Sequence, residues 1–207
     1  MQKGYLKQYF YKFTRMPYGN IFLFMFLGGF LGGIIFGNVA WSIRPGAITG
    51  LNILNAGNWM KINGSIKNYF RYLTGVRLRA PVLLMILGFT ACGMAAVYLG
   101  LIWYGFLAGL LCSAALLQLG IMGMLKLFGS LLLPLVCYLP GMAILFNQAF
   151  LMSEKSSRKS VGGMKEYGRY LLSCVLILLL IAVGILVECY VNPAVVNFFK
   201  NLISKIL

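Results

Sequence analysis

The chain has 207 residues, of which 61% are hydrophobic and only 10% are charged, whereas soluble domains are about 45–50% apolar and about 25% charged. This composition excludes a water-soluble globule, and it excludes a disordered chain, which requires low hydrophobicity. Eighteen Lys and Arg residues against three Asp and Glu residues give a net charge of +15, and the sequence contains neither Asp nor His.

Long apolar runs predict helices that cross a bilayer, because about 20 apolar residues are needed to cross its hydrocarbon core. We therefore predict an all-α fold: a polytopic membrane helix bundle, one domain over residues 1–207, with about five transmembrane helices plus amphipathic surface helices. The predicted transmembrane helices cover residues 21–41, 81–99, 101–122, 127–150 and 170–191.

Residues 1–20 form a basic segment in which Lys3, Lys7 and Lys12 alternate with apolar residues at helical spacing. This pattern is typical of an interfacial helix on an anionic leaflet. A frayed basic tail is the alternative interpretation of the same residues.

The helix predicted at 21–41 is rich in glycine pairs spaced four residues apart, and the pattern continues in the helix at 101–122. The small residues concerned are Gly28, Gly29, Gly32, Gly33, Gly37, Gly105, Gly109 and Ser113. Small residues let helix backbones approach closely in lipid. We expect packing within the chain, with a homo-oligomer interface as the alternative.

Residues 42–80 connect the first two predicted transmembrane helices and include an amphipathic stretch at 62–73. The segment contains no acidic residue, and its basic residues are Arg44, Lys61, Lys67, Arg71, Arg77 and Arg79. This cationic surface is expected to prefer anionic partners such as lipid headgroups, wall polymers or acidic protein faces.

The helices predicted at 81–99 and 101–122 would form a hairpin with Tyr98 and Tyr104 at its tip, where aromatic residues suit the membrane interface. Pro134 and Pro140 are expected to break the helix at 127–150, because proline removes a backbone donor and clashes with the preceding turn. The residues at 152–169 are predicted to form a flexible basic linker, and those at 192–207 an amphipathic tail.

Positive charge does not determine the orientation. Cytoplasmic flanks are normally enriched in Lys and Arg, but five crossings leave nine basic residues on each side. We favour five crossings with the N-terminus inside and the C-terminus outside; a re-entrant fourth helix is the alternative.

Four polar residues fall within predicted spans: Gln118, Asn147, Gln148 and Glu188. An ionisable residue inside a membrane is a functional hypothesis by default. Glu188, however, lies within a turn of its helix end, which favours a structural or interfacial role over a proton or ion relay.

The sequence contains few of the side chains that enzymes use for catalysis. Without His or Asp, a Ser-His-Asp triad or an HExxH zinc site cannot be built, and no phosphate-binding GxxxxGK[ST] motif is present. The five cysteines include no CxxC pair and are expected to pack as small apolar residues. We predict a chain that is not an enzyme, with no catalytic, cofactor or metal site and no nucleic-acid partner.

One stretch carries a family resemblance. Tyr104-Gly105-Phe106-Leu107-Ala108-Gly109 is followed by an apolar run and then by Leu133-Pro134 and Leu139-Pro140-Gly141. This pattern resembles the stage II sporulation protein M family of bacterial membrane proteins. The resemblance covers about residues 21–191, and its specific part is residues 104–141. Family members often have a polar residue after the Leu-Pro, where this chain has Gly141.

The resemblance implies a multi-pass protein of the bacterial plasma membrane that acts as a non-enzymatic scaffold. In spore formers the family member anchors a peptidoglycan-remodelling complex and recruits the stage II sporulation proteins P and D. The residues leave a second hypothesis open, a permease or accessory subunit of an exporter with an ATP-binding partner. A proline-broken helix and the four polar residues could line its path.

Overall fold

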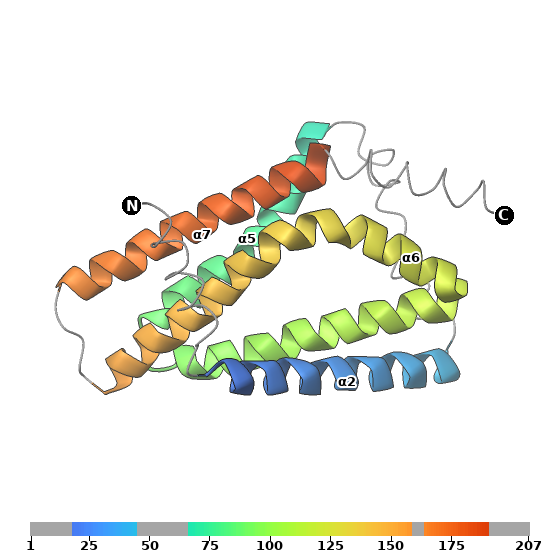
Figure 1. Cartoon of the computed structure of the whole chain (residues 1–207), viewed down its shortest axis with the longest axis horizontal. Helices are drawn as coiled ribbons and strands as arrows, with labels where there is room; N and C mark the ends of the chain where they lie inside the picture. The colour runs from blue at the N-terminus through green and yellow to red at the C-terminus, as the bar shows by residue number, and fades with distance from the viewer. Residues whose placement is uncertain (1–17, 45–65, 159–163, 191–207) are drawn as a thin grey trace, which may run out of the picture.

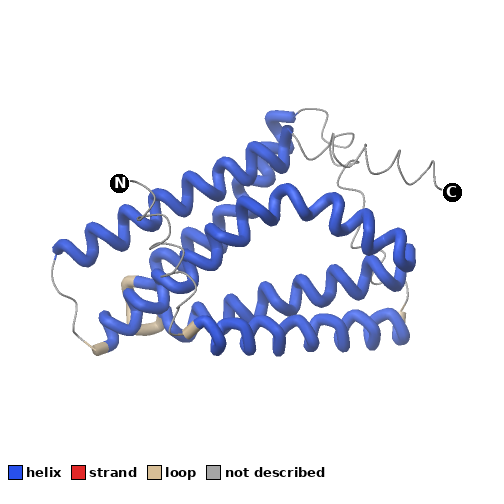
Figure 2. The backbone as a smooth tube through the Cα atoms, viewed as in Figure 1, coloured by secondary structure: helices blue, strands red, loops and turns tan. Residues whose placement is uncertain are grey.

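The computed structural model describes residues 18–44, 66–158 and 164–190 (Figures 1 and 2). They fold into α2 (Gly19–Ile43), α5 (Ile66–Gly88), α6 (Gly93–Ser157) and α7 (Met164–Tyr190), with no strand in these ranges. The all-α prediction is confirmed. The predictions for the N-terminal segment before residue 18, for Lys61 and for the tail after residue 190 lie outside the described residues.

Within the described residues, four helical segments are long and apolar enough to cross a membrane: Gly19–Ile43, Gly93–Leu125, Pro134–Ser157 and Glu166–Tyr190. Large apolar side chains also cover the outside of the bundle, as at Phe24, which is 73% exposed. Apolar surface of this extent is buried by lipid or by protein in a membrane protein.

The long helix α6 consists of two arms that meet at Gly120. This glycine has φ 60° and ψ −146°, a backbone conformation that residues with a Cβ rarely adopt. The chain reverses there, and α6 bends again in its yellow stretch (Figure 1). We name residues 93–119 the first arm and residues 121–157 the second arm.

The reversal differs from the prediction, which placed a connection at 123–126 and helix breaks at Pro134 and Pro140. Both prolines lie inside the second arm. Proline fixes φ near its helical value and removes only one backbone donor, so a helix can continue through it. The conformation at Gly120 changes the direction of the chain outright.

The turn between α5 and α6 also differs from the prediction. It lies at residues 89–92, so Tyr98 and Tyr104, the predicted hairpin tip, are inside α6. The buried Ser153 hydroxyl stabilises this turn, since it donates to the Thr90 carbonyl at 2.7 Å and accepts from the Met94 amide at 2.9 Å. A four-residue turn within a continuous apolar run leaves little trace in the hydropathy pattern.

α5 joins two segments that the prediction separated. It begins in the predicted connection 42–80 and continues through Pro81 to Gly88. Tyr69 and Leu73, within the predicted connection, belong to the hydrophobic core. This part of the connection is therefore a packed helix, since its apolar stripe is buried against the bundle.

α2 and the first arm of α6 pack at backbone contact. A Cβ added at Gly29 would collide with the Ile102 carbonyl, and one at Gly33 with the Phe106 carbonyl. Gly105 and Gly109 meet the α2 backbone in the same way, and Gly37 faces Ser113. The contacts advance together along both helices, so α2 and the first arm are parallel.

Gly28 and Gly32 do not take part in this packing, although the sequence pattern grouped them with the other glycines. Nothing in the described chain lies within 4 Å of a Cβ at either position. Each residue turns a helix by about 100°, so these two glycines lie beside the packed face.

α5, α7 and the second arm form the other unit of the bundle. α7 runs antiparallel to the second arm, because Gly184 lies against Tyr138 and Gly141 against Leu180. α5 runs antiparallel to α7, because Arg77 meets Glu188 whereas Met85 meets Tyr170. Ile181 and Ile185 are each 1% exposed and form part of the core of this unit.

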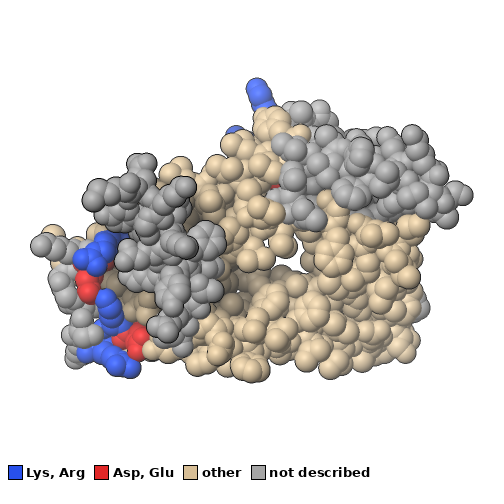
Figure 3. Space-filling model, viewed as in Figure 1, with Lys and Arg blue, Asp and Glu red and all other residues tan. Residues whose placement is uncertain are grey.

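The two units meet through an aromatic cluster near the start of α2. Phe22 and Tyr98 of the first unit contact Phe150 of the second arm, each with ring centroids 5.5 Å from those of Phe150. Away from this cluster the arms of α6 diverge, and Figure 3 shows the surface hollowed between them.

The glycine contacts between α2 and the first arm predict a position-specific effect of an added methyl group. Gly33→Ala should destabilise the protein by about 1–3 kcal/mol, because the new Cβ overpacks a backbone contact that cannot yield. Gly32→Ala is the matched control and should have little effect, because its Cβ enters open space. Thermal unfolding of both variants in detergent measures the difference; equal stabilities would contradict the packing.

Candidate functional site

All three carboxylate side chains of the sequence form ion pairs within the structure. They belong to Glu154, Glu166 and Glu188, and their cationic partners are Arg158, Lys155 and Arg77, respectively. Among the described residues, no group of three His, Cys, Asp or Glu side chains could hold a metal ion.

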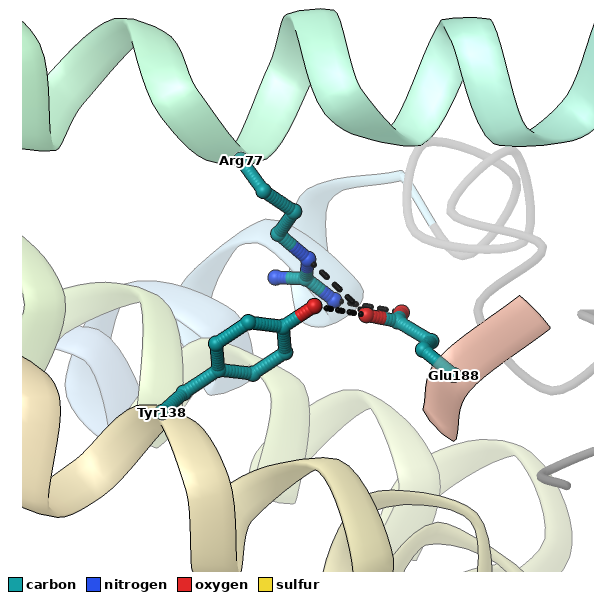
Figure 4. Close-up of polar contacts among 3 residues, drawn as sticks. All are labelled: Arg77, Tyr138 and Glu188. Carbon is teal, nitrogen blue, oxygen red and sulfur yellow. Dashed lines mark hydrogen bonds and ion pairs between the residues drawn. The ribbon is translucent and has the colours of Figure 1, made fainter. Parts of the chain in front are cut away.

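The pair at Glu188 joins three helices (Figure 4). Arg77 of α5 donates from Nη2 to Glu188 Oε1 at 2.7 Å and from Nε to Oε2 at 3.2 Å. Tyr138, on the second arm of α6, donates its hydroxyl to Oε2 at 2.9 Å. A two-pronged guanidinium–carboxylate pair of this kind is strong and fixes geometry.

The environment of this group suits a structural role. The Glu188 side chain is 10% exposed and that of Arg77 is 39% exposed. Arg77 also lies over the Tyr138 ring, 5.2 Å from its centroid, a favourable position for a cation on an aromatic face. Both oxygens of the Glu188 carboxylate therefore accept hydrogen bonds from fixed donors. This arrangement argues against a proton relay and favours a structural role in which Glu188 links α5, α6 and α7.

Arg77 differs from its prediction as part of an anion-binding surface. Its charge is directed to Glu188 and is not available to an external partner. The helical turn of α5 explains this, because Arg77 lies on the same side as Leu73 and Leu84, which are buried. No pattern in the sequence indicated Tyr138 as a partner, since this residue lies in an apolar run 50 residues from Glu188.

The other two carboxylates lie at the end of the molecule where α6 ends and α7 begins, at the left in Figure 3. Glu154 accepts from Arg158 at 2.8 Å and from the Tyr18 hydroxyl at 3.2 Å to each oxygen. Glu166 accepts from Lys155 at 2.8 Å. These contacts tie the start of α2 and the start of α7 to the second arm.

The remaining predicted polar residues do not join Glu188. Its partners, Arg77 and Tyr138, come from outside the predicted polar set. Gln118 and Gln148 lie on different arms of α6. The side-chain oxygen of Asn147 is buried without a hydrogen-bond partner in the described part of the chain.

The outer face of α5 carries cations of a different kind. Arg71 and Arg79 are exposed, and among the described residues neither has a carboxylate partner. Lys67 is also exposed on this helix, and Arg44 is exposed at the end of α2. Of the predicted cationic surface, these four positions face outward in the described structure.

Fold and polar contacts together define a helical membrane protein whose described part has an internal ion-pair network and an outward cationic helix face. No family model, no curated protein and no solved structure matches this chain. Its function must therefore be argued from its own residues.

The network at Glu188 predicts strong coupling between two substitutions. Arg77→Met or Glu188→Met alone should destabilise the protein by about 3 kcal/mol, because each leaves an uncompensated charge in an apolar setting. The double variant should be more stable than either single variant, since both charges are gone. Thermal unfolding in detergent measures all three, and additive losses would contradict the coupling.

Lys155→Met provides the control for this cycle. It removes a more exposed pair, with side chains 47% and 27% exposed. We expect a loss below about 1 kcal/mol, as for other surface ion pairs.

Proposed function

We propose that this protein is a non-enzymatic, multi-span scaffold of a bacterial plasma membrane, which recruits or anchors partner proteins. The proposal rests on where the charged side chains lie in the structure. Every carboxylate side chain links helices: Glu188 and Glu166 do so through ion pairs, and Glu154 does so by accepting from Tyr18 at the start of α2. The cations on the outer face of α5, by contrast, point outward. Carboxylates that link helices inside the bundle, together with cations exposed on its outside, suit the binding of a partner better than proton transfer or group transfer.

The proposed topology has five crossings, with α5 as the second. α2 and the first arm of α6 are parallel, so the chain must return across the bundle between them. α5 is not among the four segments that are apolar enough by composition to cross a membrane. Its 23 residues nevertheless make it about 34 Å long, which is enough to cross a hydrocarbon core of about 30 Å. Its end is joined to α6 by the short turn at residues 89–92.

Cysteine labelling tests this topology. In a variant with the five native cysteines replaced by Ala, we introduce Ser42→Cys, Thr90→Cys or Ser157→Cys, all at exposed positions. A membrane-impermeant maleimide should label Thr90→Cys and Ser157→Cys from one side and Ser42→Cys from the other. Labelling of all three from the same side would contradict five crossings.

The partner class is the finer part of the proposal. The resemblance to the stage II sporulation protein M family points to proteins that remodel peptidoglycan. The hollow between the arms of α6 (Figure 3) favours a second candidate, a membrane subunit of a transporter. In that case the partner would be an ATP-binding subunit.

Co-purification discriminates these functions. The tagged full-length protein is extracted from its native membrane in a styrene–maleic acid polymer, and its stoichiometric partners are identified by mass spectrometry. We expect a wall-cleaving enzyme or another membrane protein of the wall machinery. Recovery of an ATP-binding subunit instead would support transport, and a chain recovered alone would contradict the scaffold.

A further inference from the structure

The outward cations of α5 follow one ridge of the helix. Lys67, Arg71, Gly75 and Arg79 are spaced four residues apart, and residues at this spacing form the ridge that packs into the groove of a neighbouring helix. A Cβ at Gly75 would meet nothing within 4 Å. The ridge thus has a notch between two arginines, open toward the outside of the bundle.

The opposite side of α5 is already occupied by this chain. Tyr69, Leu73, Leu84 and Met85 are buried in the core, and α5 packs against both α6 and α7. The ridge is therefore the side of α5 left for a neighbour from outside the described bundle.

The chain cannot supply a carboxylate side chain to this ridge. Its three carboxylates are held by other cations, as described above, and the residues outside the described ranges contain no Asp or Glu. Arg71 and Arg79 therefore need a counter-charge from another molecule if α5 is embedded in a membrane. An arginine without one is costly in hydrocarbon.

Depth decides between a lipid headgroup and a protein carboxylate. Arg79 lies 13 residues after the start of α5 and nine before its end, about 20 Å and about 14 Å along the helix axis. Lipid phosphates lie at the two interfaces, so a headgroup near the start of α5 can reach Arg71. Arg79 lies two turns deeper than Arg71, about 12 Å along the helix axis, so its side chain reaches the interface at the start of α5 less readily than that of Arg71.

We propose that the ridge Arg71–Gly75–Arg79 is the docking surface for a transmembrane helix of a partner protein that carries a carboxylate near the middle of the bilayer. The carboxylate pairs with Arg79, and the notch at Gly75 admits the backbone of the partner helix. The inference rests on the proposed scaffold function and names the chemistry of its partner.

A synthetic helix tests this surface directly. The full-length protein, labelled with a donor dye, is reconstituted at pH 8 into phosphatidylcholine vesicles with an acceptor-labelled, leucine-rich transmembrane peptide carrying one central Glu. The control peptide has Gln at that position. Energy transfer should report about tenfold tighter association of the Glu peptide, as a charge-assisted pair predicts.

Variants of the ridge provide the decisive comparisons. Arg79→Gln should abolish the preference for the Glu peptide, Arg79→Lys should retain most of it, and Gly75→Leu should weaken association of both peptides by filling the notch. Arg169→Gln is the matched control, because Arg169 is an exposed arginine on α7, and it should behave as the wild type.

Three results would overturn the proposal: equal binding of the Glu and Gln peptides, an unchanged preference in Arg79→Gln, or displacement of the Glu peptide when phosphatidylglycerol replaces part of the phosphatidylcholine. The last would identify anionic lipid as the occupant. Partner recovery by wild type and Arg79→Gln separates the two proposals: if both recover the same partner, the scaffold stands and the ridge fails.

Discussion

The scarcity of carboxylates governs the polar chemistry of this protein. Three acidic side chains face eighteen basic ones, so each carboxylate can satisfy only a small part of the positive charge. The structure uses all three between helices or at helix ends, where a fixed geometry has the largest effect on the fold. The pair of Glu188 with Arg77 is the most buried of them, and it joins α5 to α7 while Tyr138 adds the second arm of α6.

The rest of the bundle is held without charge. Glycines let the backbones of α2 and of the first arm of α6 come into contact. Close packing of this kind is a main source of helix association in membranes. The aromatic cluster around Phe150 joins this pair to the other three helical segments. The two units are therefore held together differently. Backbone contact holds α2 to the first arm of α6, whereas core packing and an ion-pair network hold α5, α7 and the second arm together.

Sequence reasoning succeeded where the signal was periodic or compositional. Apolar length predicted the helices, and the spacing of Gly29, Gly33 and Gly37 placed them on one face. It failed at reversals, because Gly120 is one of 25 glycines and nothing local distinguishes its backbone conformation. The turn at 89–92 was missed for a related reason: its main support, Ser153, is about 60 residues away in the chain.

The same limitation applies to the cations. By composition alone, Arg77 and Arg79 are equivalent members of one basic segment. Two residues along a helix, however, correspond to a rotation of about 200°. One arginine therefore faces the core and meets Glu188, while the other faces outward. Because the supply of carboxylates within the chain is exhausted, this rotation separates a cation that stabilises the fold from one that remains available to bind another molecule.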